Sequence, residues 1–347
     1  QEDKMPITKE IIQLMDTLAE SIAHTIKDYV NNDFCDENDK DHVLKWVSQF
    51  DEDDRLFVLK QTDLLLKKQY FTKDNFEILL DNAIKDTASK TLHDTSFLDV
   101  QLDGKSQSDM LEILNNSCLN THNFPININN YTKNRFVYQD DVVFTGDRVC
   151  RDLEEWIIHS APHQCSLLIA SLYTHTSALY NIEKNLIQTI NISGKSISLS
   201  LVCFGKIYEN KFIMRNQSDV FWPKEENVNI PNNLDPIRFI STAPQGQAPG
   251  RTGFAASYVF ENGNDRDRFE KILCEKGFYI ISLCNNPAAS MKPLGYKTYR
   301  GLGFGGTIFT YRNCPNNTPL VFWWGNPNME DWNPLSKWYP LMMRKTY

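Results

Sequence analysis

A short stretch of the sequence combines two neighbouring carboxylates with a turn that could bind a phosphate. It reads FVYQDDVVFTGDR and spans residues 136–148. Its first four residues have strand character, so Asp140 and Asp141 are expected at the carboxyl end of a strand. Thr145 and Gly146 are expected in a tight turn that leads into a helix. Carboxylates accept hydrogen bonds from the hydroxyls of a sugar diol, and backbone amides at a helix N-terminus bind anions. The two carboxylates could therefore bind the hydroxyls of a ribose 5-phosphate, and the turn could bind its phosphate.

The two residues after Gly146 affect how this turn would treat a phosphate. The guanidinium of Arg148 could donate directly to a phosphate oxygen. The carboxylate of Asp147 would repel the phosphate unless it points away. The stretch also fits a simpler interpretation, in which a buried strand ends in an ordinary acidic turn.

A second stretch with anion-binding character lies upstream, where the strand-like FLDVQLD is followed by the helical pattern GKSQSDMLEILNN. Gly104 would let the backbone approach an anion. Ser106 and Ser108 could cap the helix and donate hydrogen bonds, and the helix N-terminus favours negative charge. Simple N-capping also explains the serines, and the two roles are compatible.

Three other motifs point less clearly to a site. GLGFGG at residues 301–306 lacks the strand before it and the helix after it that a dinucleotide site needs, so a mobile loop or a substrate lid is expected there. His159 and His163 have no third ligand in sight, so no metal site is expected. The aromatic residues near the C-terminus could stack on a nucleobase, but burial in the core is their commoner fate. These residues are Trp323, Trp324, Trp332, Trp338 and Tyr339.

The elements that must position these residues fall into two kinds. Residues 1–92 show apolar residues at helical spacing, with Thr8 as the expected N-cap of the first helix. From Phe97 onward, strands such as FVYQ, CSLLIASLYT and SISLSLVCFGKI alternate with amphipathic helices. This alternation is typical of a parallel sheet covered on both faces, whose ligands bind outside the carboxyl ends of the strands.

The last third of the sequence is expected to carry a helix in DRDRFEKILCEKG that ends at Gly277, and then a strand in FYIISLC. We therefore expect three regions. They are an N-terminal helical module at 1–92, an α/β core at 93–215, and a C-terminal region at 216–347 that includes the remaining core elements.

Composition limits the class of protein. The 347 residues are 41% hydrophobic, enough for a sizeable core, and a net charge of −8 argues against a nucleic-acid surface spread over the whole chain. A local basic groove stays possible. The eight cysteines include no CxxC pair, so reduced thiols are expected rather than structural zinc. No run of about 18 apolar residues occurs. We expect a cytoplasmic protein with no membrane span.

The stretch at 136–148 resembles the ribose-phosphate loop of the type I phosphoribosyltransferases, in which two acids, two apolar residues and Thr-Gly follow a strand. The resemblance implies that Asp140 and Asp141 bind the 2- and 3-hydroxyls of ribose. It assigns the 5-phosphate to the turn formed by Thr145, Gly146, Asp147 and Arg148. The upstream loop is similar to the one that handles pyrophosphate, which implies contacts from Gly104, Lys105, Ser106 and Ser108, with Lys105 in a catalytic role beside the two aspartates.

Three separated motifs together are similar to one branch of this superfamily. FLDVQLDGKSQSDM, YQDDVVFTGDR and NCPNNTPLVFWW resemble a phosphoribosyltransferase-like family of bacterial conflict and antiphage systems, including operons with a reverse transcriptase. The likeness covers roughly residues 40–347. It implies an α/β fold with a parallel-sheet phosphoribosyltransferase-like core, an N-terminal helical module and a C-terminal hood.

The resemblance implies an effector that binds phosphoribosyl pyrophosphate or a nucleotide and acts at the anomeric carbon, with Mg²⁺ bound through the ligand rather than by protein side chains. It further implies a protein or ribonucleoprotein partner from a retron-like defence operon, and a homo-oligomer is possible. Purine-salvage members have an acid just before Thr-Gly, whereas this chain has Phe144, so salvage of hypoxanthine or guanine is doubtful. Two alternatives stay open: a non-catalytic module that senses a nucleotide or a nucleic-acid end, and a scaffold that docks a partner.

Overall fold

The computed structural model describes residues 8–102, 106–209, 217–239, 251, 256–296 and 301–344. The chain divides into two compact units. Unit 1 combines residues 1–73 with 211–346, and unit 2 is formed by residues 74–210. The region limits expected at 92 and 215 stay a prediction, but the contacts group the first 73 residues with the last third of the chain.

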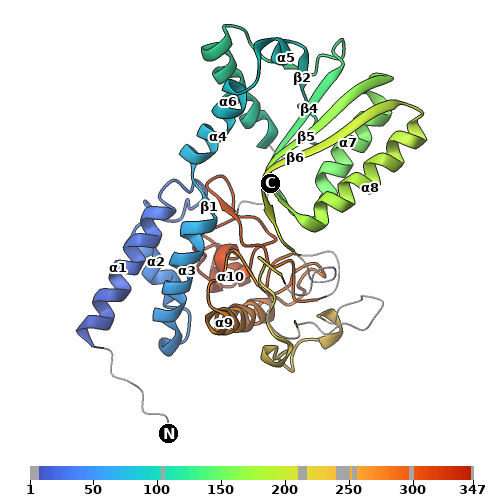
Figure 1. Ribbon diagram of the computed structural model, residues 1–347. Coiled ribbons are helices and arrows are strands. Elements are labelled where there is room, and N and C mark those ends of the chain that lie inside the picture. Colours follow the sequence, from blue (N-terminus) through green and yellow to red (C-terminus); the bar gives the residue numbers. More distant parts are fainter. Residues whose placement is uncertain are drawn as a thin grey trace. The chain divides into compact units, whose positions relative to one another are not determined.

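The regular secondary structure of unit 1 is mainly helical. Its N-terminal part contains α1 (Lys9–Thr25), α2 (Lys40–Val47) and α3 (Arg55–Gln69), and its C-terminal part contains α9 (Gly263–Ser282) and α10 (Leu320–Trp323) (Figure 1). The N-cap predicted for the first helix is confirmed, because the side chain of Thr8 accepts a hydrogen bond from the amide of Ile11. The short strands β1 (Tyr70–Phe71) and β7 (Phe309–Thr310) pair in parallel.

One hydrophobic core joins the two parts of unit 1. Trp46 of α2 is fully buried, stacks on Phe322 of α10 and donates its indole N–H to the carbonyl of Val321. The hydroxyl of Tyr29 donates to the carbonyl of Met343. The expected burial of the C-terminal aromatics is confirmed for Trp323, Trp324 and Trp338, whereas Trp332 is 78% exposed.

The expected strand in FYIISLC is wrong, because α9 continues through this segment to Ser282. A run of buried apolar residues does not by itself distinguish a strand from a buried helix. Gly277, which was expected to end the helix, lies inside it. A Cβ at this position would come within 2.5 Å of the carbonyl oxygen of Pro293, so glycine here permits close packing rather than helix termination.

The expected mobile loop at residues 301–306 is also wrong. Residues 302–306 are buried, and the amide of Gly305 donates to the carbonyl of Leu294 while its own carbonyl accepts from the amide of Phe221. Gly305 has a φ of +77°, and a Cβ there would lie 2.1 Å from the carbonyl oxygen of Phe221. Gly303 and Gly305 therefore serve core packing.

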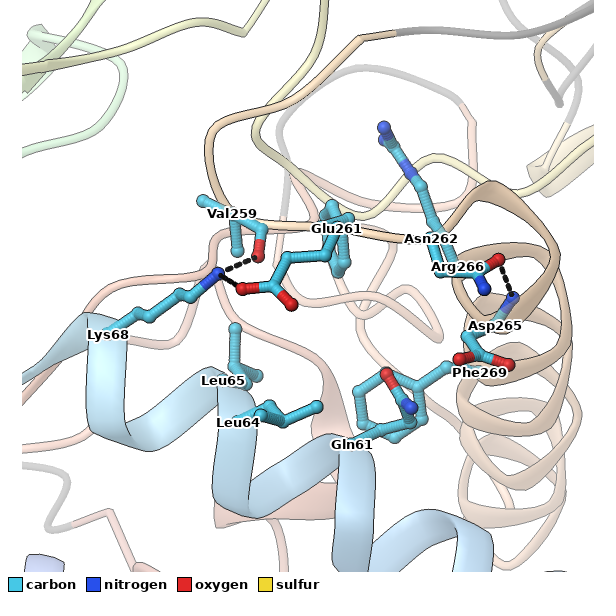
Figure 2. A pocket seen from close by; sticks show the side chains of 11 residues that line it. Gln61, Leu64, Leu65, Lys68, Val259, Glu261, Asn262, Asp265, Arg266 and Phe269 are labelled. Carbon is cyan, nitrogen blue, oxygen red and sulfur yellow. Dashed lines mark hydrogen bonds and ion pairs between the residues drawn. The ribbon is translucent and has the colours of Figure 1, made fainter.

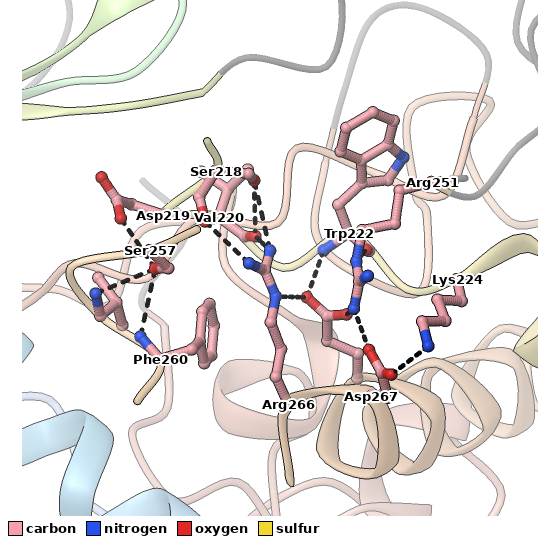
Figure 3. A network of polar contacts seen from close by, with 12 residues as sticks. Ser218, Asp219, Val220, Trp222, Lys224, Arg251, Ser257, Phe260, Arg266 and Asp267 are labelled. Atoms are coloured by element: carbon pink, nitrogen blue, oxygen red, sulfur yellow. Dashed lines mark hydrogen bonds and ion pairs between the residues drawn. The ribbon is translucent and has the colours of Figure 1, made fainter. Parts of the chain in front are cut away.

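A buried polar network ties α9 to the preceding segments of unit 1 (Figure 3). Glu270 is fully buried and accepts hydrogen bonds from Arg266 Nε at 2.8 Å, from Arg251 Nη2 at 3.3 Å and from the amide of Trp222 at 2.9 Å. Asp267 pairs with Arg251 and also with Lys224. Because buried charges are tolerated only when paired, this network fixes how residues 217–224 pack on α9.

Unit 2 is built on a five-stranded parallel sheet, as the sequence predicted. The strand order is β3-β2-β4-β5-β6. The strands are β2 (Thr95–Phe97), β3 (Asn127–Ile128), β4 (Arg135–Val143), β5 (Gln164–His175) and β6 (Ser196–Ile207). The strand that carries the two aspartates is therefore the central one, flanked by two strands on each side.

Helices cover both faces of this sheet. The helices are α4 (Lys73–Lys85), α5 (Ser89–His93), α6 (Ser106–His122), α7 (Asp147–His159) and α8 (Thr176–Ser193). Helices α7 and α8 lie next to each other on one side of the sheet, and α6 lies on the other (Figure 1). Leu153, Trp156 and Ile182 of α7 and α8 form a core with Phe136 of β4 and Leu167 of β5.

No helix among the described residues is long and apolar enough to cross a membrane.

Candidate functional site

The two aspartates lie within the central strand rather than after it. Strand β4 was expected to stop at Gln139, but it runs to Val143, and Asp140 is in register with Ser171 of β5. Asp140 is 4% exposed, whereas Asp141 is half-buried. Each carboxylate accepts a hydrogen bond from the next amide, at 2.9 Å from Asp141 and at 2.7 Å from Val142. The sheet thus fixes the backbone of both acids.

The electrostatic state of Asp140 is unusual for a carboxyl group. Burial raises its pKa well above its ordinary range, and the neighbouring charge of Asp141 raises it further. The guanidinium of Arg148 acts in the opposite direction. Burial and a like charge both favour the neutral form of an acid. A protonated Asp140 can donate as well as accept a hydrogen bond, which suits it to a hydroxyl ligand.

The turn after β4 has the form expected from the sequence. Gly146 is the N-cap of α7 with a φ of +84°, and a Cβ there would lie 2.8 Å from Ile182 Cγ1, so both conformation and space require glycine. Phe144 stacks on His175, with ring centroids 4.6 Å apart. His175 Nδ1 lies 2.9 Å from the carbonyl oxygen of Val143. The turn is therefore held from β5 as well as from β4.

Thr145 and Asp147 interact with each other in this turn. The Thr145 hydroxyl donates to Asp147 Oδ2 at 2.9 Å, and the amide of Asp147 donates back to Thr145 Oγ1 at 3.3 Å. The carboxylate of Asp147 thus lies beside the hydroxyl that was expected to contact a phosphate. Arg148 is exposed in the first turn of α7. Burial raises the pKa of Asp152 on the same helix, and the charge of Arg148 opposes this only weakly.

The second expected loop is only partly described. Gly104 and Lys105 lie outside the described residues, and α6 begins at Ser106. Ser108 donates to the two carboxylate oxygens of Asp99, at 3.2 and 3.3 Å. The start of α6 also contacts the diacid strand, because Gln107 Nε2 donates to the carbonyl of Gln139 at 3.2 Å. The structure therefore brings the second loop's helix to the residue that precedes Asp140.

The sequence motifs did not identify Gln107 and Asp152, which are 0% and 1% exposed. Asp152 Oδ2 accepts from the hydroxyl of Tyr138 at 2.9 Å, and Asp152 Oδ1 accepts from the amide of Leu102 at 3.3 Å. One signal was present in the sequence: Gln107 shares the helical spacing of the buried residues Met110 and Leu111. A polar residue at a position with core spacing usually has a buried partner.

Neither the histidines singled out in the sequence nor the hollow in unit 1 forms a comparable site among the described residues. His159 is exposed and lies 3.5 Å from Glu155, and no three His, Cys, Asp or Glu side chains of the described residues come together around a metal position. A hollow in unit 1 lies between α3 and the start of α9 (Figure 2). Its lining includes Leu64, Leu65 and the ion pair of Lys68 with Glu261, and none of the expected site residues.

Comparison with known families gives one match. Residues 43–344 match the family model described as PRTase-CE, a phosphoribosyltransferase-like family of conflict effectors. The match covers most of the chain and includes both stretches of the candidate site. No curated protein matches the chain.

Proposed function

Because the chain belongs to the PRTase-CE family, which gives it a phosphoribosyltransferase-like function, we propose that unit 2 binds a ribose 5-phosphate or diphosphate ligand and acts at its anomeric carbon. The observation that supports this most strongly is the pair Asp140 and Asp141 on the central strand, followed within four residues by the Thr145–Gly146 turn at the start of α7. Acids whose pKa is raised by burial gather at binding and catalytic sites, so the state of Asp140 supports this assignment beside the geometry.

We assign the roles as follows. Asp140 and Asp141 bind the 2- and 3-hydroxyls and fix the orientation of the sugar. Thr145, the amides after Gly146 and the Arg148 guanidinium bind the 5-phosphate. Reaction at an anomeric carbon passes through an oxocarbenium-like state, so fixing the sugar at both ends lowers the barrier by orientation. Gly104, Lys105, Ser106 and Ser108 would stabilise the pyrophosphate as it leaves.

Mg²⁺ would be held through the diphosphate and ribose oxygens of the ligand rather than by protein side chains, because this hard cation prefers oxygen ligands. When bound, the cation would neutralise charge on the diphosphate. Every other role in the proposal belongs to side chains and amides of the chain.

Ligand binding tests this proposal directly. Phosphoribosyl pyrophosphate with Mg²⁺ should raise the melting temperature of the protein, because it binds only the folded form, and adenine dinucleotides should raise it less. The reverse ranking would count against a phosphoribosyl site. Release of pyrophosphate or free base, followed by mass spectrometry, then distinguishes an enzyme from a sensor. A protein that binds the ligand but forms no product with any nucleotide or nucleic acid is a sensor.

The sensor is the second candidate function, and one observation favours it. The position before Thr-Gly holds Phe144, whose ring stacks on His175, so it offers no carboxylate toward a base. The setting that we propose for either function is an antiphage defence system of the retron type, with a ribonucleoprotein or protein partner. The support is the family match and the likeness of the three motifs. Equal phage plating with and without the operon would contradict it.

Asp147 should weaken phosphate binding, and its removal should strengthen it. We expect Asp147→Asn to increase the affinity for ribose 5-phosphate by roughly fivefold, because it removes a negative charge near the phosphate; at about 5 Å in water this repulsion is about 1 kcal/mol. Isothermal titration calorimetry at low and high salt is the measurement, and the gain should shrink as salt screens the charge. Weaker binding by the variant would instead mean that Asp147 contacts the ligand, for example through a cation.

A further inference from the structure

The parallel sheet of unit 2 ends in two very different edge strands. One edge is β3, with the two residues Asn127–Ile128, and the other is β6, with the twelve residues Ser196–Ile207. An edge strand presents backbone N–H and C=O groups that no neighbouring strand pairs, and proteins commonly protect such an edge by keeping the strand very short. The β3 edge is protected in this way, whereas the β6 edge is not.

Strand β6 also lacks the other features that protect an edge. Its sequence, SISLSLVCFGKI, contains no proline and no acid, and its one charged residue is Lys206 near the end. Its register with β5 stays constant from Ser196 to Ile207, so no β-bulge turns the strand away. Strand β6 is therefore long and regular, about 40 Å from end to end, and one of its sides is open to pairing.

Alternate residues of β6 direct their backbone groups away from β5. The amide of Ser196 donates toward β5, to the carbonyl of His163, and this sets the alternation along the strand. The outward groups therefore belong to the odd-numbered residues from Ile197 to Gly205. Among the described residues, these groups make no backbone hydrogen bond outside the ladder of β5 and β6.

Strand β6 carries exposed apolar side chains beside this open edge. Val202 is 52% exposed and Phe204 is 67% exposed. They are two residues apart, so they lie on the same face of the sheet. The opposite face of β6 packs against the core of α7 and α8 through residues such as Leu199 and Leu201. Apolar side chains gathered beside an unpaired edge mark an interaction surface.

We propose that β6 pairs in antiparallel fashion with β6 of a second copy of the chain, about a two-fold axis at Cys203, so that the two sheets join into one. Residues that lie directly opposite each other across such a pair share a face of the sheet. An axis at Cys203 therefore places Val202 of each copy opposite Phe204 of the other. This register buries the exposed apolar side chains of both copies, and a β-branched residue opposite an aromatic one is a favourable pair.

The charges and the second edge of the sheet favour another copy of the chain over a strand from a different protein. Lys206 of one copy would lie opposite Ser200 of the other, so the pairing of β6 brings no like charges face to face. Once β6 is paired, the remaining edge of each sheet is the two-residue strand β3, which offers little to a further strand. The assembly therefore closes at two chains with one self-complementary interface.

Analytical ultracentrifugation of the full chain tests this proposal. We expect the wild type to sediment with the mass of two chains. Val202→Asp should raise the dissociation constant by roughly tenfold or more, because it places a carboxylate opposite the ring of Phe204 in both halves of the interface. Ile192→Asp is the matched control and should leave the mass unchanged, since Ile192 is a 76% exposed apolar residue at the end of α8 in the same unit.

A mixture of two variants tests the position of the axis. Phe204→Lys alone should also dissociate, because its charge would face Val202 of the other copy. A one-to-one mixture of Val202→Asp and Phe204→Lys should recover the two-chain species. In the mixed pair the aspartate of one variant faces the lysine of the other, and one native pair of Val202 and Phe204 remains. If Val202→Asp does not fold, Phe204→Lys carries the comparison with the control.

Hydrogen–deuterium exchange gives a second measurement. The outward amides between Ile197 and Gly205 should exchange more slowly in the wild type than in Val202→Asp at the same concentration, because pairing gives them acceptors. The amides of α7 and α8 should exchange alike in both proteins, which shows that the variant is folded.

Three results would overturn the proposal. A wild type that stays a single chain at the highest concentration measured would show that β6 does not pair with itself, and protection of β6 by an added protein would then assign the edge to a different partner. Variants that keep the two-chain mass, or oligomers larger than two chains, would show that another surface joins the copies. A mixture that stays dissociated while the wild type pairs would refute the axis at Cys203.

Discussion

Replacing Asp140 and Asp141 together by Asn should abolish phosphoribosyl binding without unfolding unit 2. Asp141 would lose a charge-assisted hydrogen bond to a ribose hydroxyl, worth about 1.5–3 kcal/mol, and Asp140 would lose a neutral one, worth about 0.5–1.5 kcal/mol. Together these losses weaken binding by at least about thirtyfold, since about 1.4 kcal/mol is a factor of ten. Calorimetry with ribose 5-phosphate measures the loss.

The same double variant should be more resistant to unfolding at neutral pH than the wild type. The pKa of Asp140 is raised in the folded protein, so the folded state binds its proton more tightly than the unfolded state does. The free energy of unfolding of the wild type therefore falls as the pH rises from about 3.9, the ordinary pKa of Asp, to the raised pKa of Asp140 in the folded state. Asn does not titrate, so the variant loses this pH dependence. A variant that melts lower at pH 7 would mean that the pair is structural, and a folded variant with full binding would refute the ligand role.

Replacing Glu270 by Gln should strongly destabilise unit 1. The change removes the negative charge that Arg266 and Arg251 share in the buried network of α9, and Asp267 is then the remaining carboxylate of that network. Breaking a buried ion pair from one side costs about 3–5 kcal/mol. For a unit of this size that corresponds to a fall of roughly 10 °C in melting temperature, to be measured by calorimetry.

Glu275→Gln is the matched control, because Glu275 lies on the same helix, is exposed, and pairs with Lys271 at 4.0 Å. An exposed pair of this kind is worth at most about 1 kcal/mol. Equal effects of the two substitutions would show that the network of Glu270 adds nothing beyond its surface counterpart. Ligand binding by unit 2 is a second readout, and Glu270→Gln should leave it unchanged at a temperature where the protein is folded.

The sequence predicted the part of the fold that depends on local pattern. Strands β4, β5 and β6 with the helices between them follow from alternating apolar and amphipathic segments, which need no knowledge of distant contacts. The strand predicted for FYIISLC was wrong because an apolar run of this length fits a strand and a buried helix equally well, and the segment continues the helix α9 that begins at Gly263. The prediction of a mobile loop at residues 301–306 was also wrong. The close approach of Phe221 to Gly305 depends on tertiary packing, which the local sequence does not encode.

The candidate site was predictable where one stretch of chain builds it. The spacing of Asp140, Asp141, Thr145 and Gly146 is local, and the structure places them on one strand and the turn after it. The extension of β4 through both acids depends on pairing with β5, which the motif does not encode. The hydrogen-bond acceptors for the amides of residues 99–102 come from three separate segments, at 107, 129 and 152, and two of these are 30 or more residues away, so no single motif could reveal them.

The shared core of unit 1 has a consequence for the order in which the chain can fold during synthesis. The ribosome releases α1, α2 and α3 first, but the partners of Trp46 and Tyr29 are near residues 321 and 343. All of unit 2 is made in between, and its contacts are complete once β6 has emerged. The N-terminal helices must therefore wait with apolar faces uncovered, a state that favours chaperone binding or aggregation. Translation arrested before residue 320 should leave unit 2 folded and the first 73 residues open to proteolysis.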